Sequence, residues 1–129
     1  MCPIKLERVA INVPDLDEAM RMFESIGINF GAVREVQQPG GTTARVALSR
    51  LGVELFETST AATEVSVRSF HLRVDDVDRA AEEVAKKGGK LITRFAVGKM
   101  EEAICSFYGL RIVFVSYPGS DPVAAFVEG

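Results

Sequence analysis

The fold of this chain is decided by the stretch Val9-Ala10-Ile11-Asn12-Val13-Pro14-Asp15-Leu16-Asp17-Glu18-Ala19, because it returns 61 residues later. The second copy reads Phe70-His71-Leu72-Arg73-Val74-Asp75-Asp76-Val77-Asp78-Arg79-Ala80, and the same register places Gly27 opposite Gly88. A repeat of about half the chain predicts two copies of one supersecondary unit, related by a pseudo-two-fold axis. Two such halves can enclose a cavity, so the residues that face inward are expected to decide the function.

The composition is that of one ordinary globular domain. The chain has 129 residues, of which 47% are apolar and 26% charged, so we expect a single folded domain spanning 1–129. The net charge of −3, without a stripe of Lys and Arg, argues against a nucleic-acid-binding protein. No apolar run approaches the roughly 18–20 residues of a membrane span, and the N-terminus lacks the apolar segment of a secretory signal. With only Cys2 and Cys105, far apart in the sequence, we expect no disulfide framework and a cytoplasmic protein.

The first copy predicts a strand, a helix and three further strands. Apolar and polar residues alternate over 6–13, as in a half-buried strand. Asp15 is a good helix N-cap, and Gly27 ends the helix that follows. The apolar stripe of this helix consists of Leu16, Ala19, Met20, Phe23 and Ile26. Three strands are then expected over 28–36, 43–49 and 53–58, joined by turns at 38–41 and 50–52.

The second copy repeats this order of elements. We expect a strand over 65–74, a helix over 76–87, and strands over 90–95, 101–107 and 111–117. The result is an α+β fold of two tandem βαβββ modules, about 4–58 and 65–117, each packing its helix through Phe23 or Val84. The inner faces of the two sheets would surround a central cavity. The tail from Pro118 to Gly129 is expected to be an appendage or a contact in a homodimer.

These residues resemble a known family. Arg8 to Ala19 resembles the opening of the vicinal oxygen chelate superfamily, which contains glyoxalase I, methylmalonyl-CoA epimerase, extradiol dioxygenases and bleomycin-resistance proteins. The stretch from Phe70 to Asp78 resembles the start of its second module, and Gly109 to Val115 resembles its last strand. The similarity covers roughly residues 4 to 117 and implies the glyoxalase-like fold. It does not identify the activity, because one fold supports many functions.

The resemblance also implies four metal-ligand positions, one on the first and last strand of each module. The first-strand ligand, usually His, is Arg8 here, five residues before Val13. The fourth-strand ligand, usually Glu or Gln, is Glu54, which matches the family. The fifth-strand His is replaced by Ser69, and the eighth-strand Glu by Val113. A protonated guanidinium repels a cation and Val113 offers no ligand atom, so we expect no metal and no other cofactor.

Two alternatives remain open for the polar residues. His71, the only histidine, keeps the inward parity of Ser69, and is either a general base or a satisfied polar residue that lines a pocket. Arg8 and Glu54 would form a structural ion pair in place of the metal, or Arg8 would bind an anionic ligand. Arg73 and Arg111 share the inward parity and would either strengthen such an anion site or reach solvent.

Three functions follow from these observations. The first is a protein that binds a small, anionic organic molecule in its cavity without a metal. The second is a glyoxalase-type lyase or an epimerase that uses Glu54 and His71 as catalytic residues. The third is a non-catalytic, dimeric interaction module. Apolar residues expected to line the cavity favour the first two functions, and they are Ala10, Ala47, Phe56, Ile104, Val113 and Val115.

Overall fold

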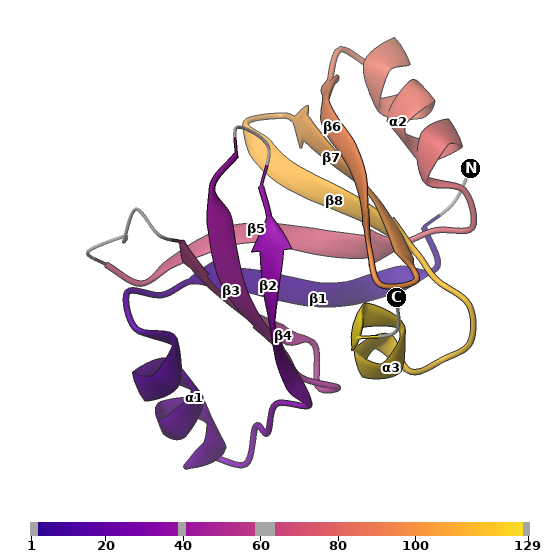
Figure 1. Cartoon of the computed structure of the whole chain (residues 1–129). Coiled ribbons are helices and arrows are strands. Elements are labelled where there is room, and N and C mark those ends of the chain that lie inside the picture. Colours follow the sequence, from indigo (N-terminus) through magenta and orange to yellow (C-terminus); the bar gives the residue numbers. More distant parts are fainter. Residues whose placement is uncertain (1–2, 39–40, 59–63, 128–129) are drawn as a thin grey trace. The chain divides into compact units, whose positions relative to one another are not determined.

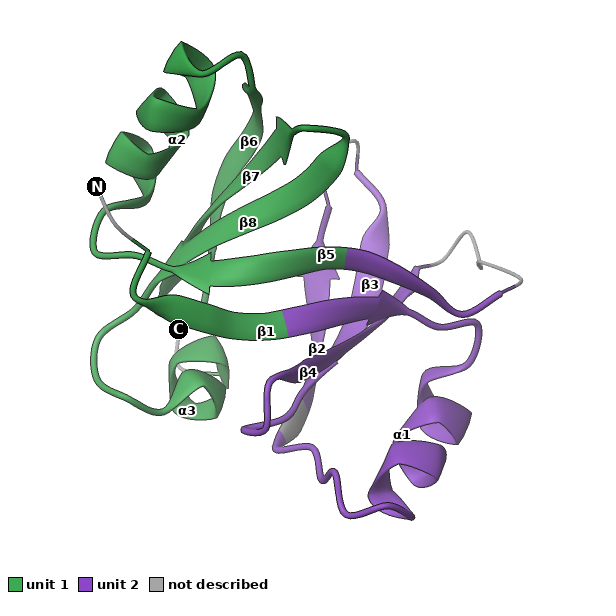
Figure 2. Ribbon diagram, turned by 180° about the vertical axis from the view of Figure 1, so that it is seen from behind, with its two compact units in different colours: residues 1–8, 69–129 green, residues 9–68 purple. Residues whose placement is uncertain are grey.

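The computed structural model describes residues 3–38, 41–58 and 64–127, and it divides the chain into two compact units. Unit 1 comprises residues 1–8 and 69–129, and unit 2 comprises residues 9–68 (Figure 2). Strand β1 (Lys5–Asn12) and strand β5 (Ser66–Arg73) each begin in one unit and end in the other. The two units are therefore built from interleaved parts of the sequence rather than from two consecutive halves.

Unit 2 contains a four-stranded sheet and one helix. After β1 come α1 (Leu16–Glu24), β2 (Ala32–Gln37), β3 (Thr43–Leu48) and β4 (Val53–Thr58). The strand order is β2-β3-β4-β1, in which β4 pairs in parallel with β1 and the other neighbours are antiparallel (Figure 1). The strand expected over 28–36 begins only at Ala32, and the turn expected at 38–41 includes Pro39 and Gly40, which lie outside the described residues.

Unit 1 repeats this connectivity. Strand β5 is followed by α2 (Val77–Lys86), β6 (Lys90–Val97), β7 (Met100–Phe107), β8 (Leu110–Ser116) and α3 (Pro122–Val127). Its order is β6-β7-β8-β5, with β5 parallel to β8 and the hairpins antiparallel (Figure 1). The start of β1 also belongs to this unit, and just before it the amide of Ile4 donates to the carbonyl of Arg73 at 2.7 Å. The prediction of two βαβββ modules in an α+β fold is confirmed.

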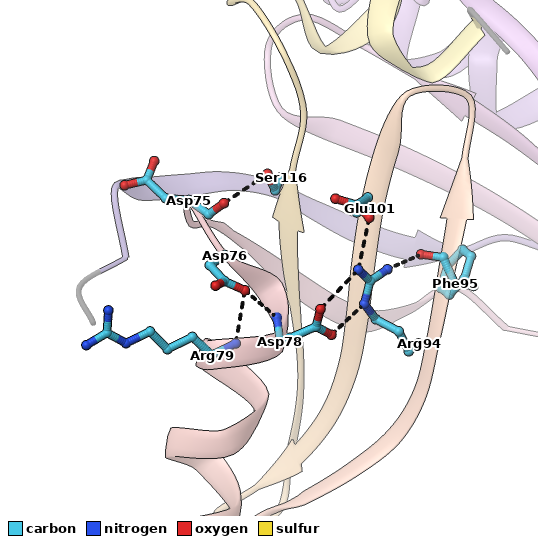
Figure 3. Close-up of polar contacts among 8 residues, drawn as sticks. All are labelled: Asp75, Asp76, Asp78, Arg79, Arg94, Phe95, Glu101 and Ser116. Atoms are coloured by element: carbon cyan, nitrogen blue, oxygen red, sulfur yellow. Dashed lines mark hydrogen bonds and ion pairs between the residues drawn. The ribbon is translucent and has the colours of Figure 1, made fainter.

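The repeated residues cap and end the helices in the same way in both copies. The carboxylate of Asp15 accepts a hydrogen bond from the amide of Glu18, and that of Asp76 accepts from the amides of Asp78 and Arg79 (Figure 3). Both carboxylates satisfy amides that have no partner within the first helical turn. Gly27 and Gly88 both have φ of 92°, a conformation that disfavours other residues and ends each helix.

Each helix covers one face of its own sheet with apolar side chains. Phe23 of α1 packs against the core of unit 2, and Val84 of α2 belongs to the core of unit 1, as predicted. Ala47 was expected to line a cavity, and this is wrong. It pairs with Leu55, and both are part of the core under α1, because they share the parity that points toward the helix. Ala47 therefore supports packing rather than ligand binding.

Part of the C-terminal tail, Pro122–Val127, forms helix α3 of unit 1, which the sequence pattern did not predict as an element. The amide of Lys99, in the β6–β7 turn, donates to the carbonyl of Ala125 at 2.8 Å. Within α3, Val123, Ala125 and Phe126 are buried. This short helix has no polar face long enough to show helical periodicity, so only its tertiary contacts distinguish it from a loop.

A surface ion-pair network connects α2 to the β6–β7 hairpin. The guanidinium of Arg94, on β6, contacts Asp78 at 2.8 Å and Glu101 at 3.0 Å (Figure 3). The pKa of the Asp78 carboxyl is lowered by its hydrogen bond with Arg94, and the pKa of Arg94 is raised by the same contact. Because these groups are solvent-exposed, we expect the network to add little to stability.

Candidate functional site

Three charged or ionisable side chains are buried together in unit 1. Arg8 on β1, His71 on β5 and Glu102 on β7 are only 2%, 4% and 3% exposed. We call these three residues the Arg8 cluster. Buried charges are rare in proteins unless they are paired or functional, so this cluster is the strongest candidate for a site within a single unit.

The strands direct this cluster to the face of the sheet that α2 does not cover. His71 pairs with Val113, and Glu102 pairs with Val115. The alternate residues of the same strands, such as Ala103, Ile112 and Phe114, form the core under α2. Because successive side chains of a strand point to opposite faces, His71 and Glu102 project away from that core.

Arg8 and Glu102 form a buried ion pair. One guanidinium nitrogen of Arg8 donates to Oε2 of Glu102 at 3.1 Å, and the other lies 3.8 Å from the sulfur of Met100. Burial alone would raise the pKa of the Glu102 carboxyl, but the charge of Arg8 and the contact with His71 outweigh it. The pKa of Glu102 is therefore lowered, and its side chain is a carboxylate at neutral pH.

His71 contacts the same carboxylate through one ring nitrogen. Its Nε2 lies 3.6 Å from Oε1 of Glu102, whereas Nδ1 is buried and has no hydrogen-bond partner among the described residues. At this distance the contact is electrostatic rather than a hydrogen bond, and the negative charge of Glu102 favours the tautomer that has its proton on Nε2. In a neutral imidazole, this leaves a lone pair on Nδ1.

The structure brings most of the expected site residues of unit 1 together. Ser69 and Val113 are buried on the same face as His71. Arg8 contacts Glu102, whose side chain lies on this face. Arg111 differs from them, because it lies exposed at the start of β8. Glu54 is buried in unit 2, on the face of β4 that points away from α1. The expected Arg8–Glu54 pair joins residues of different units and stays a prediction.

Arg73 holds the chain that follows β8. Its guanidinium donates to the carbonyls of Tyr117 at 3.1 Å and Gly119 at 2.7 Å, and it stacks on the Tyr117 ring at 4.0 Å. The hydroxyl of Tyr117 donates to the carboxylate of Glu7 at 2.5 Å. Burial and this hydrogen bond raise the pKa of Tyr117 to about 12. Arg73 therefore has a structural role at the end of the sheet, next to α3.

Glu102 is the functional candidate that the sequence reasoning missed. It is next to Glu101 near the start of a strand, and the side chains of two consecutive acidic residues are usually both exposed to solvent. A signal was nevertheless available, because Glu102 lies two residues before Ile104 and so shares the inward parity assigned to Ile104. The structure confirms that the two glutamates point to opposite faces: Glu101 is exposed and pairs with Arg94, and Glu102 is buried.

The residues at the family's metal positions do not fit a metal ion. Among the residues that the structure describes, no group of three or more His, Cys, Asp and Glu side chains could hold one. Within unit 1, the three expected positions carry the guanidinium of Arg8, the hydroxyl of Ser69 and the aliphatic side chain of Val113. The positive charge at this face comes from Arg8, which cannot act as a ligand.

The cysteine of the described chain, Cys105, is buried in the α2 core, where burial raises the pKa of its thiol.

No helix in the described part of the chain is long and apolar enough to span a membrane. Two surface depressions within the single units have linings that do not include Arg8, His71 or Glu102. One lies beside α3 in unit 1 and includes Lys99 and Asp121, and one in unit 2 includes Asn29 and Arg50. Neither contains a buried charged side chain, so we place the chemistry at the cluster instead.

Comparison with known proteins identifies one family. The model of the Glyoxalase/Bleomycin resistance protein/Dioxygenase superfamily matches residues 5–108. No curated protein is similar enough in sequence to be matched.

Solved structures of methylmalonyl-CoA epimerases share the fold. The enzyme from Mycobacterium tuberculosis has 15% identity and a TM-score of 0.72, with 91% of this chain and 90% of that chain covered. An epimerase in complex with methylmalonyl-CoA and NH4+ has 14% identity and a TM-score of 0.74, with 93% and 99% covered. A Streptomyces coelicolor epimerase variant in complex with 2-nitronate-propionyl-CoA has 15% identity and a TM-score of 0.73, with 92% and 100% covered. At these identities the similarity establishes the fold alone.

Proposed function

Because this chain belongs to the glyoxalase/bleomycin resistance protein/dioxygenase superfamily, we propose that it binds a small anionic organic molecule without a metal ion. The ligand would contact the face of unit 1 that carries Arg8, Ser69 and His71. The observation that supports this proposal is the buried ion pair of Arg8 and Glu102 on that face. The guanidinium of Arg8, whose charge Glu102 offsets, is the cationic group on this face that an anionic ligand would contact.

The chemistry of Arg8 favours a carboxylate as the charged group of the ligand. Its planar guanidinium presents several N–H donors, and such donors match the two oxygens of a carboxylate. Ser69 adds a hydroxyl, and Val113 and Val115 add apolar surface beside it on the same face. The similar epimerase structures contain methylmalonyl-CoA or 2-nitronate-propionyl-CoA, so carboxylate-bearing acyl thioesters are reasonable probes.

Calorimetry on chelator-treated protein tests this proposal. Methylmalonyl-CoA, free methylmalonate and coenzyme A would be titrated into the wild type, Arg8→Met and Arg111→Met. We expect binding of a carboxylate-bearing probe to survive EDTA, to weaken at least about tenfold in Arg8→Met, and to stay within a few-fold in Arg111→Met, since Arg111 is exposed. A protein that retains about one Zn, Ni, Co or Fe per chain and loses binding with EDTA would contradict the proposal.

A second candidate function is a proton-transfer enzyme of the epimerase or glyoxalase kind that uses His71, with Glu54 as a further catalytic group. The observation that favours it is the buried Nδ1 of His71, for which the described residues provide no partner. A residue that only lined a pocket would be expected to satisfy both ring nitrogens.

We also propose that the chain forms a homodimer. The equivalent positions of the two copies expose apolar side chains, namely Ile4 and Leu6 in unit 1 and Val65 and Val67 in unit 2. Such residues are more common at interfaces than on open surface. Analytical ultracentrifugation at micromolar concentration would show a dimer of the 14.0 kDa chain, and a monomer at all concentrations would contradict it.

A further inference from the structure

We propose that Nδ1 of His71 is the general base of a proton-transfer reaction, and that Glu102 is the positioning residue that makes this nitrogen available. The inference rests on the proposed function, because the substrate would occupy the ligand-binding face of unit 1. It goes further in assigning the reacting atom, the tautomer and the partner residue.

The geometry separates the two ring nitrogens of His71. Nε2 faces Oε1 of Glu102 at 3.6 Å, and Oε2 of the same carboxylate accepts from Arg8 at 3.1 Å. Glu102 therefore contacts a cation with one oxygen and the imidazole with the other. Arg8 maintains Glu102 in its ionised form, and the negative charge of that carboxylate favours the proton of His71 on the nearer nitrogen, Nε2.

Nδ1 then has a lone pair in a buried setting. No described residue donates to it, and an unsatisfied buried polar atom normally has a reason, such as a catalytic role or an absent ligand. Carboxylate–imidazole pairs of this kind orient a histidine and stabilise the imidazolium that forms when it accepts a proton. The charged groups that face His71 on the described elements are Glu102 and, through it, Arg8.

The matching substrate is a small carboxylate-bearing acyl compound with an acidic C–H bond next to its carbonyl group. This C–H bond breaks, its electron pair moves into the enolate, and the proton goes to Nδ1. The imidazolium is stabilised by Glu102, and because Arg8 and Glu102 offset each other, the new charge on the imidazolium is the net positive charge that stabilises the enolate. Return of the proton to the same face of the carbon restores a neutral imidazole and the acyl compound with its configuration retained, and no oxidant or further reactant is required.

Nitrogen NMR tests the tautomer without any ligand. His71 is the only histidine of the chain, so its two ring nitrogens can be assigned directly. We expect Nδ1 to be unprotonated and Nε2 protonated at neutral pH in the wild type and in Glu101→Gln. In Glu102→Gln this preference should weaken, and in Glu102→Asp it should be partly restored. A wild-type protein with the proton on Nδ1 would overturn the inference.

Isotope exchange tests the chemistry. Methylmalonyl-CoA in D2O would be followed by mass spectrometry, with calorimetry of the same probe in parallel. We expect the wild type to incorporate deuterium at the α-carbon. His71→Gln should lower this rate at least about 100-fold while binding changes by less than about fivefold. Glu102→Asp should retain part of the rate, with a shifted pH profile.

The outcomes separate the two proposals. Binding of the probe without any deuterium incorporation would overturn the general-base assignment and leave the binding function in place. Exchange that persists in His71→Gln would also overturn it. If none of the carboxylate-bearing probes binds to the wild type, the proposed function fails and the catalytic inference fails with it.

Discussion

The buried ion pair of Arg8 and Glu102 should be strongly coupled in stability. The perturbation is a double-mutant cycle of Arg8→Met, Glu102→Gln and both together, measured as free energy of unfolding in urea. Removing one partner breaks the buried ion pair, and this costs about 3–5 kcal/mol. Removing both leaves two neutral side chains, so the double variant should be less destabilised than the sum of the singles.

The magnitude follows from burial and distance. The two side chains are 2% and 4% exposed, and their closest atoms are 3.1 Å apart. With an effective dielectric constant of about 20, two unit charges at this separation attract by about 5 kcal/mol. Desolvation offsets part of this attraction, so we expect a coupling energy of at least about 2 kcal/mol. For a chain of this size, each single variant should lower Tm by roughly 10 °C or more.

The exposed ion pair of Glu101, the neighbour of Glu102, with Arg94 provides a matched control for the buried pair. Glu101 and Arg94 are also 3.0 Å apart, but their side chains are 59% and 31% exposed. The cycle of Arg94→Met and Glu101→Gln should therefore show coupling below about 1 kcal/mol. Two-state unfolding is checked by the coincidence of circular dichroism and fluorescence curves. If the two Arg8–Glu102 singles add to within about 0.5 kcal/mol, the buried pair is not coupled and the reasoning is refuted.

Four further results are expected. The pKa of Tyr117 is raised to about 12, so the stability that Tyr117 contributes is complete below pH 10 and lost as the pH rises through 12. Absorbance titration of the wild type against Tyr117→Phe measures this, and ionisation of Tyr117 near pH 10 would contradict it. Asp76→Ala removes the cap of α2 and should cost about 1 kcal/mol in urea unfolding, whereas no change would show that the cap is dispensable. Gly89→Ala places a Cβ 2.8 Å from a backbone carbonyl oxygen and should destabilise by about 1–3 kcal/mol, and unchanged stability would mean that the backbone yields there. A cycle of Glu54→Gln with Arg8→Met should be non-additive if the expected pair exists, and additive singles would remove that pair.

Much of the fold could be predicted from local sequence signals. The repeat, the capping residues Asp15 and Asp76 and the positive-φ glycines act within a few residues, so the chain encodes them directly. Strand alternation identified the face of Ser69, His71 and Val113, because the side-chain period of a strand is two. Strand alternation assigned Ala47 to the wrong face of the sheet. The correct face follows only from the pairing of Ala47 with Leu55, that is, from the register between β3 and β4.

The sequence by itself determined two βαβββ modules, the helix caps and the absence of the usual ligands at Arg8, Ser69 and Val113. Only the tertiary structure decided that Arg8 pairs with Glu102, and that His71 shares this carboxylate. The residues of the Arg8 cluster come from three strands and are separated by up to 94 positions in the chain. Periodicity assigns a face to each strand, but it contains no information on which side chains of different strands meet. Burial then decides their chemistry, because the same glutamate is a solvated surface charge at position 101 and a buried partner of a cation at position 102.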